Sequence, residues 1–139
     1  MVKKIFAPER DTFLTSAALL VLRVWLGLTM LFHHGLGKLT GFSHLAPDFP
    51  DPLGVGRTAS LALAVFAEFF ASLLILFGLV TRFGALVLAI NMSVACFIVL
   101  KSVLSNSNAE LAFLYLAGYV TLLIAGPGRV SADRLLFSK

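Results

Sequence analysis

The sequence predicts an all-α protein, an integral membrane four-helix bundle that forms a single transmembrane domain over residues 1–139. Hydrophobic residues make up 59% of the chain and charged residues 13%, against roughly 25% charged residues in a typical soluble domain. The mean hydropathy is +0.97, and the apolar residues fall into four segments of membrane-spanning length. These four segments leave no room for a separate soluble catalytic domain.

The first segment, about residues 13–37, combines an apolar helix with a stripe of polar and small residues. At about 100° per residue, one narrow face of this helix carries Arg23, Gly27, Met30, His34 and Lys38. A charged side chain in hydrocarbon costs roughly 2.5 to 3.5 kcal/mol. We therefore expect this face to point toward other helices or a water-filled cavity.

Proline-rich and polar residues separate the first segment from the next two. Residues 40–56 hold three prolines within six positions, which excludes a continuous helix and predicts a long outer loop that partly covers the bundle. The second span, about 58–80, contains a lone glutamate, Glu68. A tight turn then leads to the third span, about 83–100, which contains Asn91.

Lysine and arginine residues predict the orientation of the spans. The fourth span, about 109–125, ends at a Gly-Pro-Gly sequence, which leaves the carboxyl-terminal tail on the side of the amino terminus. The two tails and the turn at Arg82 hold seven lysines and arginines, whereas the opposite side holds three, Lys38, Arg57 and Lys101. By the positive-inside rule, both termini are predicted to be cytoplasmic.

Composition also limits the chemistry. The net charge of +4 comes from cations at helix ends and forms no basic patch with exposed aromatic residues, so we expect no nucleic-acid partner. Cys96 is the only cysteine, which leaves no thiol pair within one copy. Two of the three histidines, His33 and His34, are adjacent on one helix and cannot both aim at one metal, so neither a metal site nor a haem is expected. Because the chain holds no self-contained catalytic constellation, whether it is an enzyme stays open.

Depth in the membrane predicts which polar side chains can meet. Arg23 lies 15 residues, about 22 Å, below Lys38, and Glu68 lies 11 residues, about 16 Å, below Arg57. An arginine side chain can cover the difference, so an ion pair between Arg23 and Glu68 is predicted near mid-membrane, with Asn91 at a similar level. Whether this pair serves a ligand or only locks the bundle stays open.

A second polar layer is predicted nearer the outer surface. His34 and Lys38 of the first span lie level with Glu110 at the start of the fourth span. Together with Met30, they predict a binding cleft that is apolar below and polar at its mouth, which suits an amphipathic ring or a lipid headgroup. His34 titrates near neutral pH and could exchange a proton with such a ligand, although a histidine near a helix end is also common as an interfacial residue.

Several short sequences resemble the DoxX family in their order and spacing, over nearly the whole chain. They are Arg23, the run from His34 to Lys38, Glu68, the run from Leu76 to Arg82, and Gly126 to Arg129 followed by Ser131 and Asp133. Where many members carry a glycine pair after the glutamate, this chain has Ala71-Ser72. The resemblance implies a four-helix bundle in the bacterial or archaeal inner membrane. It also implies an association with quinone-linked oxidoreductases and with membrane complexes that respond to thiol or oxidative stress.

Three functions stay open at this point. A membrane subunit of a quinone-linked oxidoreductase or redox-stress complex would bind a quinone or a lipid among the polar groups of the bundle. A non-catalytic scaffold or assembly factor would use the same groups only for structure. A small-solute or proton carrier is less expected, because a four-helix chain lacks the inverted repeats of many carriers unless copies associate. We expect no cofactor built into the chain, while a bound quinone stays open. The expected partners are the bilayer, an oxidoreductase subunit or further copies of the chain.

Overall fold

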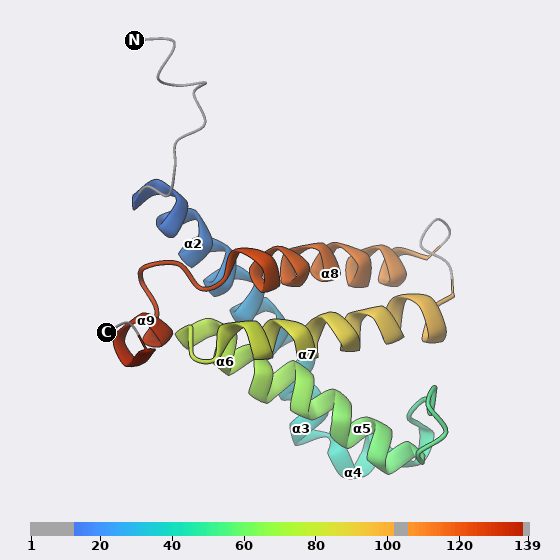
Figure 1. Cartoon of the computed structure of the whole chain (residues 1–139). Coiled ribbons are helices and arrows are strands. Elements are labelled where there is room, and N and C mark those ends of the chain that lie inside the picture. Colours follow the sequence, from blue (N-terminus) through green and yellow to red (C-terminus); the bar gives the residue numbers. More distant parts are fainter. Residues whose placement is uncertain (1–12, 102–105, 138–139) are drawn as a thin grey trace.

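The computed structural model describes residues 13–101 and 106–137, and every regular element within them is a helix. Four helical segments in these ranges are long and apolar enough to cross a membrane (Figure 1). The predicted all-α membrane fold class is confirmed.

Each span is a run of consecutive helical elements. They are α2 (Phe13–Met30), η1 (Leu31–Gly35) and α3 (Leu36–Thr40) in the first span; α5 (Arg57–Val65), η3 (Phe66–Ala71) and α6 (Ser72–Phe77) in the second; α7 (Thr81–Ser93) and η4 (Val94–Val99) in the third; and α8 (Ser107–Ala125) in the fourth. The elements η1, η3 and η4 are π-helical. The span boundaries expected from the sequence differ from these by three residues or fewer.

Glycine and asparagine residues set several span ends. Gly78 has a φ of 68°, a left-handed conformation in which the N–H groups of Gly78 and Leu79 bond back to the last turn of α6. At the start of α8, the side chain of Asn106 accepts a hydrogen bond from the N–H of Asn108 at 2.9 Å. Gly126, with a φ of 80°, ends that helix.

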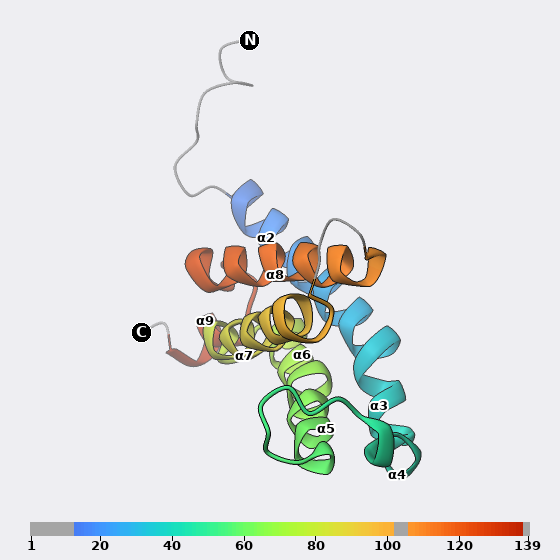
Figure 2. The same cartoon turned by 90° about the vertical axis from the view of Figure 1, so that its right-hand side faces the viewer.

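The four spans form two differently packed pairs. In Figures 1 and 2, α7 and α8 lie side by side and antiparallel, whereas α2 crosses the second span and packs against α6. The second and third spans meet at the tight turn after Phe77 and diverge away from it (Figure 1). We call the end of the bundle with this turn the turn end, and the opposite end, with residues 41–56, the loop end.

Both the core and the outer surface of the bundle are apolar. The largest fully buried side chains include Tyr119, Met30, Leu88 and Leu122. Many large apolar residues also lie on the outside, such as Trp25, which is 71% exposed. An apolar outer surface of this extent is suited to lipid and not to water.

The predicted outer loop, residues 40–56, is helical in its first half. Two short helices, α4 (Phe42–Leu45) and η2 (Ala46–Asp48), precede the irregular residues 49–56. Pro47 lies in the first turn of η2, a position where a proline is tolerated because its missing N–H would have no helical partner.

Asp51 fastens the irregular part of this loop to the start of α5. Its carboxylate accepts hydrogen bonds from the N–H groups of Val55 at 3.0 Å and Gly56 at 2.9 Å, and from the Ser60 hydroxyl at 2.8 Å. These bonds, led by that from Ser60, stabilise the carboxylate and lower the pKa of Asp51.

The carboxyl-terminal segment fastens the turn end of the bundle. Asp133, in α9 (Ala132–Phe137), accepts hydrogen bonds from the backbone N–H of Thr81 at 2.9 Å and of Val80. Its own N–H donates to the carbonyl of Gly78 at 2.8 Å. The aspartate therefore satisfies the free N–H groups at the start of α7 from a segment about 50 residues away.

Candidate functional site

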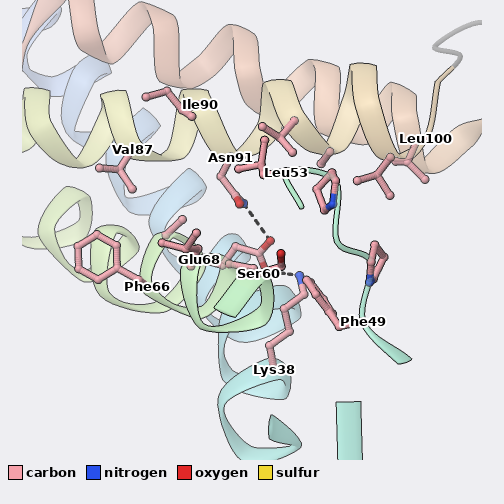
Figure 3. A pocket seen from close by; sticks show the side chains of 18 residues that line it. Lys38, Phe49, Leu53, Ser60, Phe66, Glu68, Val87, Ile90, Asn91 and Leu100 are labelled. Carbon is pink, nitrogen blue, oxygen red and sulfur yellow. Dashed lines mark hydrogen bonds and ion pairs between the residues drawn. The ribbon is translucent and has the colours of Figure 1, made fainter. Parts of the chain in front are cut away.

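Three polar side chains meet inside the bundle toward its loop end. Lys38 in α3 forms an ion pair with Glu68 in η3, and the side-chain amide of Asn91 in α7 donates to the other Glu68 oxygen at 3.0 Å (Figure 3). Glu68 is 5% exposed, while the side chain of Lys38 is 25% exposed. We call these three residues the polar cluster. It joins the first, second and third spans.

A glycine brings the first two spans close enough for this cluster to form. A Cβ atom on Gly35 would overlap the backbone carbonyl of Glu68, so only glycine fits at this crossing. Both spans are π-helical where they cross, over η1 and η3. A π-helical turn changes which side chains share a helix face, and such turns are frequent at functional sites.

The predicted ion pair between Arg23 and Glu68 is not formed. The prediction placed Lys38 level with Arg57, but the crossing places Gly35, three residues before Lys38, level with Glu68. The first span continues five residues beyond the crossing, to Thr40, whereas the second begins eleven residues beyond it, at Arg57. Glu68 is therefore within reach of Lys38 and not of Arg23.

Arg23 lies at the turn end instead, where its guanidinium contacts backbone carbonyl groups. Its guanidinium donates to the carbonyl of Ile75 at 3.4 Å and to that of Val130. A Cβ on Gly78 would overlap the same guanidinium, and the φ of 68° at this position also favours glycine. These contacts join the carboxyl-terminal segment to the first two spans.

A cavity of about 500 Å³ lies on one side of the polar cluster, between the second span, the third span and the loop (Figure 3). All three residues of the cluster line it, together with Ser60. The rest of its lining is apolar. Sequence reasoning did not identify this cavity, because it depends on how the loop packs back over two diverging helices.

A second cavity, of about 240 Å³, lies between the first, third and fourth spans. Met30 and His34 line it, and Lys38 and Glu68 line both cavities. The ion pair, with Ala95 and Leu100, therefore lies where the two cavities adjoin. The structure thus gathers four of the predicted site residues around the smaller cavity and three around the larger one, with two shared.

Aromatic rings extend from the smaller cavity into the core. His34 meets Tyr115 edge to face, with ring centroids 5.8 Å apart, and Tyr115 stacks on the buried Tyr119 at 6.0 Å. Tyr115 was not among the predicted site residues, although its place on the same face as Asn108 and Leu111 could have indicated it. Glu110 points elsewhere: it is exposed and lines neither cavity.

The polar cluster can act as a hydrogen-bonding group in an apolar setting. The ammonium of Lys38 and the amide of Asn91 are donors, and Glu68 holds both in place. Within residues 13–101 and 106–137, no three His, Cys, Asp or Glu side chains come together as metal ligands would.

Comparison with known proteins gives one family and two relatives. The family model for DoxX matches residues 18–101, a range that contains the whole polar cluster. The inner membrane protein YqjF of Escherichia coli K12 is 31% identical over 129 residues, which cover 91% of this chain and 97% of YqjF. An uncharacterized protein of Haemophilus influenzae is 29% identical over 129 residues, covering 88% of this chain and 85% of that protein. No solved structure matches the chain.

Proposed function

This chain belongs to the DoxX family of membrane proteins, and we propose that its larger cavity binds the ring of a quinone, in the membrane subunit of an oxidoreductase or redox-stress complex. The chain is a multi-pass inner membrane protein. The observation that carries the proposal is a mostly apolar cavity of about 500 Å³ with the polar cluster in its wall.

The chemistry of the cavity matches the two kinds of surface on a quinone. The ring is apolar on its faces and carries carbonyl oxygens at its edges, which accept hydrogen bonds. Lys38 and Asn91 supply the donors, while apolar residues such as Val87 and Leu63 line the rest. A few polar groups in an apolar pocket fix the orientation of a ligand without holding it irreversibly.

Lys38 would also influence the redox behaviour of a bound ring. A hydrogen bond donated to a ring oxygen becomes stronger as that oxygen gains negative charge, so it favours the form of the ligand that carries more electrons. Since Cys96 is the only cysteine, a thiol pair within one copy cannot supply these electrons. We therefore place the electron donor in a partner subunit.

A structural role is the second candidate. Glu68 accepts from both Lys38 and Asn91, so the charge of Lys38 is paired and the cluster joins the spans without a ligand. A scaffold or assembly factor would need the cluster only to join three spans.

Substitution of two asparagines, one in the lining of each cavity, distinguishes the quinone-binding function from the structural one. Asn91 lines the larger cavity and Asn108 the smaller one. In native mass spectrometry of the purified protein with a quinone, we expect Asn91→Ala to weaken binding about five- to tenfold, through one lost hydrogen bond of about 1 to 1.4 kcal/mol. Asn108→Ala should leave binding unchanged.

Other outcomes of this experiment are equally clear. A loss only in Asn108→Ala would move the ring to the smaller cavity, beside His34. No binding by folded wild-type protein at any quinone concentration tested would support the scaffold.

A further inference from the structure

The larger cavity opens sideways, between the second and third spans. Its apolar lining includes Leu63 and Phe66 on the second span and Ile90 on the third, which are 53%, 44% and 57% exposed. The two spans diverge from the tight turn (Figure 1), and Phe66 and Ile90 lie on the two diverging helices (Figure 3). Because the outer surface of the spans faces lipid, this opening faces the hydrocarbon of the bilayer.

The loop covers the cavity from the loop end. Phe49, Pro50, Pro52 and Leu53 line the cavity on this side. Asp51, between the two prolines, holds this stretch to α5 through its hydrogen bonds, as described above. The route from the bilayer is therefore lined by exposed apolar side chains, while the route from water passes a fastened loop.

The polar cluster also restricts the charge of the head of a ligand. The charges of Lys38 and Glu68 cancel, and Asn91 is neutral. An anionic lipid headgroup near Lys38 would also approach the carboxylate of Glu68, which repels it. The site therefore suits an uncharged polar head and not a phospholipid.

We propose that the larger cavity takes its ligand directly from the bilayer: a molecule with an uncharged polar ring at Lys38 and Asn91 and an apolar chain that leaves between Leu63 and Ile90. This proposal rests on the proposed function for the position of the ring. It adds the route, the chain and the charge of the ligand. Because the chain moves from lipid hydrocarbon to an apolar cavity, its contacts with the protein stabilise the complex through van der Waals packing.

The test uses one quinone ring with and without a long isoprenoid chain, bound to protein in nanodiscs at fixed ratios of ligand to lipid. Ile90→Ala shortens a side chain along the proposed chain path. Leu86→Ala, on the same helix, is the matched control, because Leu86 is also exposed but does not line the cavity. We expect Ile90→Ala to weaken binding of the long-chain quinone about two- to fivefold through lost van der Waals contacts, with little effect on the chainless ring, and Leu86→Ala to change neither.

The possible failures are distinguishable. If both ligands bind, but Ile90→Ala and Leu63→Ala affect them no more than Leu86→Ala does, the lateral path is wrong while the ring site stands. If neither ligand binds to the folded protein, the proposed function and the chain path both fail. Binding of an anionic phospholipid in competition with the ring would overturn the inferred charge of the head.

Discussion

Lys38 illustrates how one side chain can be assigned to the wrong environment from sequence alone. Its position at the end of an apolar segment made it a cation of the outer loop in the count of charges. In the structure its long side chain reaches back to Glu68, so the stem lies among apolar residues and only a quarter of the side chain is exposed. Its ammonium group is thus part of the wall of both cavities.

We expect Lys38 and Glu68 to be energetically coupled. Lys38→Met and Glu68→Gln should each destabilise the detergent-solubilised protein, because each leaves its partner without an opposite charge. The double change should cost about 1 to 3 kcal/mol less free energy of unfolding than the sum of the two. Thermal or denaturant unfolding of the four proteins measures this difference.

The pair of Arg23 and Glu68 provides the control for this comparison of single and double substitutions. Arg23→Gln combined with Glu68→Gln should be additive within about 0.5 kcal/mol, because Arg23 donates to the carbonyls of Ile75 and Val130 and not to Glu68. Coupling of Arg23 to Glu68 that equals the coupling of Lys38 would contradict the assignment of partners.

Two neighbouring glycines should respond oppositely to the same substitution. Gly35→Ala would press a methyl group into the Glu68 carbonyl and should destabilise the protein by about 1 to 3 kcal/mol. Gly37 has no atom within 4 Å of an added Cβ, so Gly37→Ala should be neutral or stabilising by up to about 1 kcal/mol. Melting temperatures in one detergent measure both effects, and equal effects would mean that the spans do not cross at Gly35.

At the scale of elements, the positions of the helices could be predicted from the sequence, but the way in which the helices cross could not. The spans follow from local signals, such as the run of apolar residues that ends at Gly126. The partner of Glu68 depends on where two helices cross and on the π-helical turns at that point. No periodicity of the sequence encodes either feature. The prediction therefore assumed parallel helices whose outer ends lie at the same depth, and this assumption paired Glu68 with Arg23.

The attachment of the loop to the start of α5 depends on pH, because it rests on the carboxylate of Asp51. The pKa of Asp51 is lowered in the folded protein, so its contribution to stability is complete above its ordinary value of 3.8 and is lost as the pH falls through the lowered value. We expect the amide resonances of Val55 and Gly56 to be constant between about pH 5 and 8 and to shift only below about pH 4. NMR titration in nanodiscs measures this transition.

Asp51→Asn is the control for the titration of the loop. The asparagine cannot ionise in this range, so the shift of both amides at low pH should disappear. A transition at or above the ordinary aspartate value in the unmodified protein would show that the hydrogen bonds to Val55, Gly56 and Ser60 do not hold the carboxylate.

At the scale of the whole molecule, the two ends of the bundle are fastened differently. The turn end is held by the carboxyl-terminal segment, through Asp133 and through the contact of Arg23 with Val130. The loop end is held by the polar cluster and Asp51. Of the residues predicted for the site, Met30, His34, Lys38, Glu68 and Asn91 line cavities, whereas Arg23 contacts backbone carbonyls at the turn end and Glu110 lies on the surface. The sequence could identify both groups as polar residues within an apolar bundle, but it could not separate their contacts, which join residues 23 to 107 positions apart.

The orientation of the whole bundle remains a prediction, and the structure sharpens the argument for it. Because Lys38 is paired inside the bundle, the loop end keeps two lysines and arginines in its loops, Arg57 and Lys101, against seven on the other side. We expect a phosphatase that is active only in the periplasm to be silent when fused after Lys139 and active when fused after Lys101. The fusion after Lys101 is the control that the reporter works, and it requires only that three spans insert. The reverse pattern, activity after Lys139 and silence after Lys101, would place the loop and the fastened end of the cavity in the cytoplasm, and the head of any ligand would then lie nearer the cytoplasmic face.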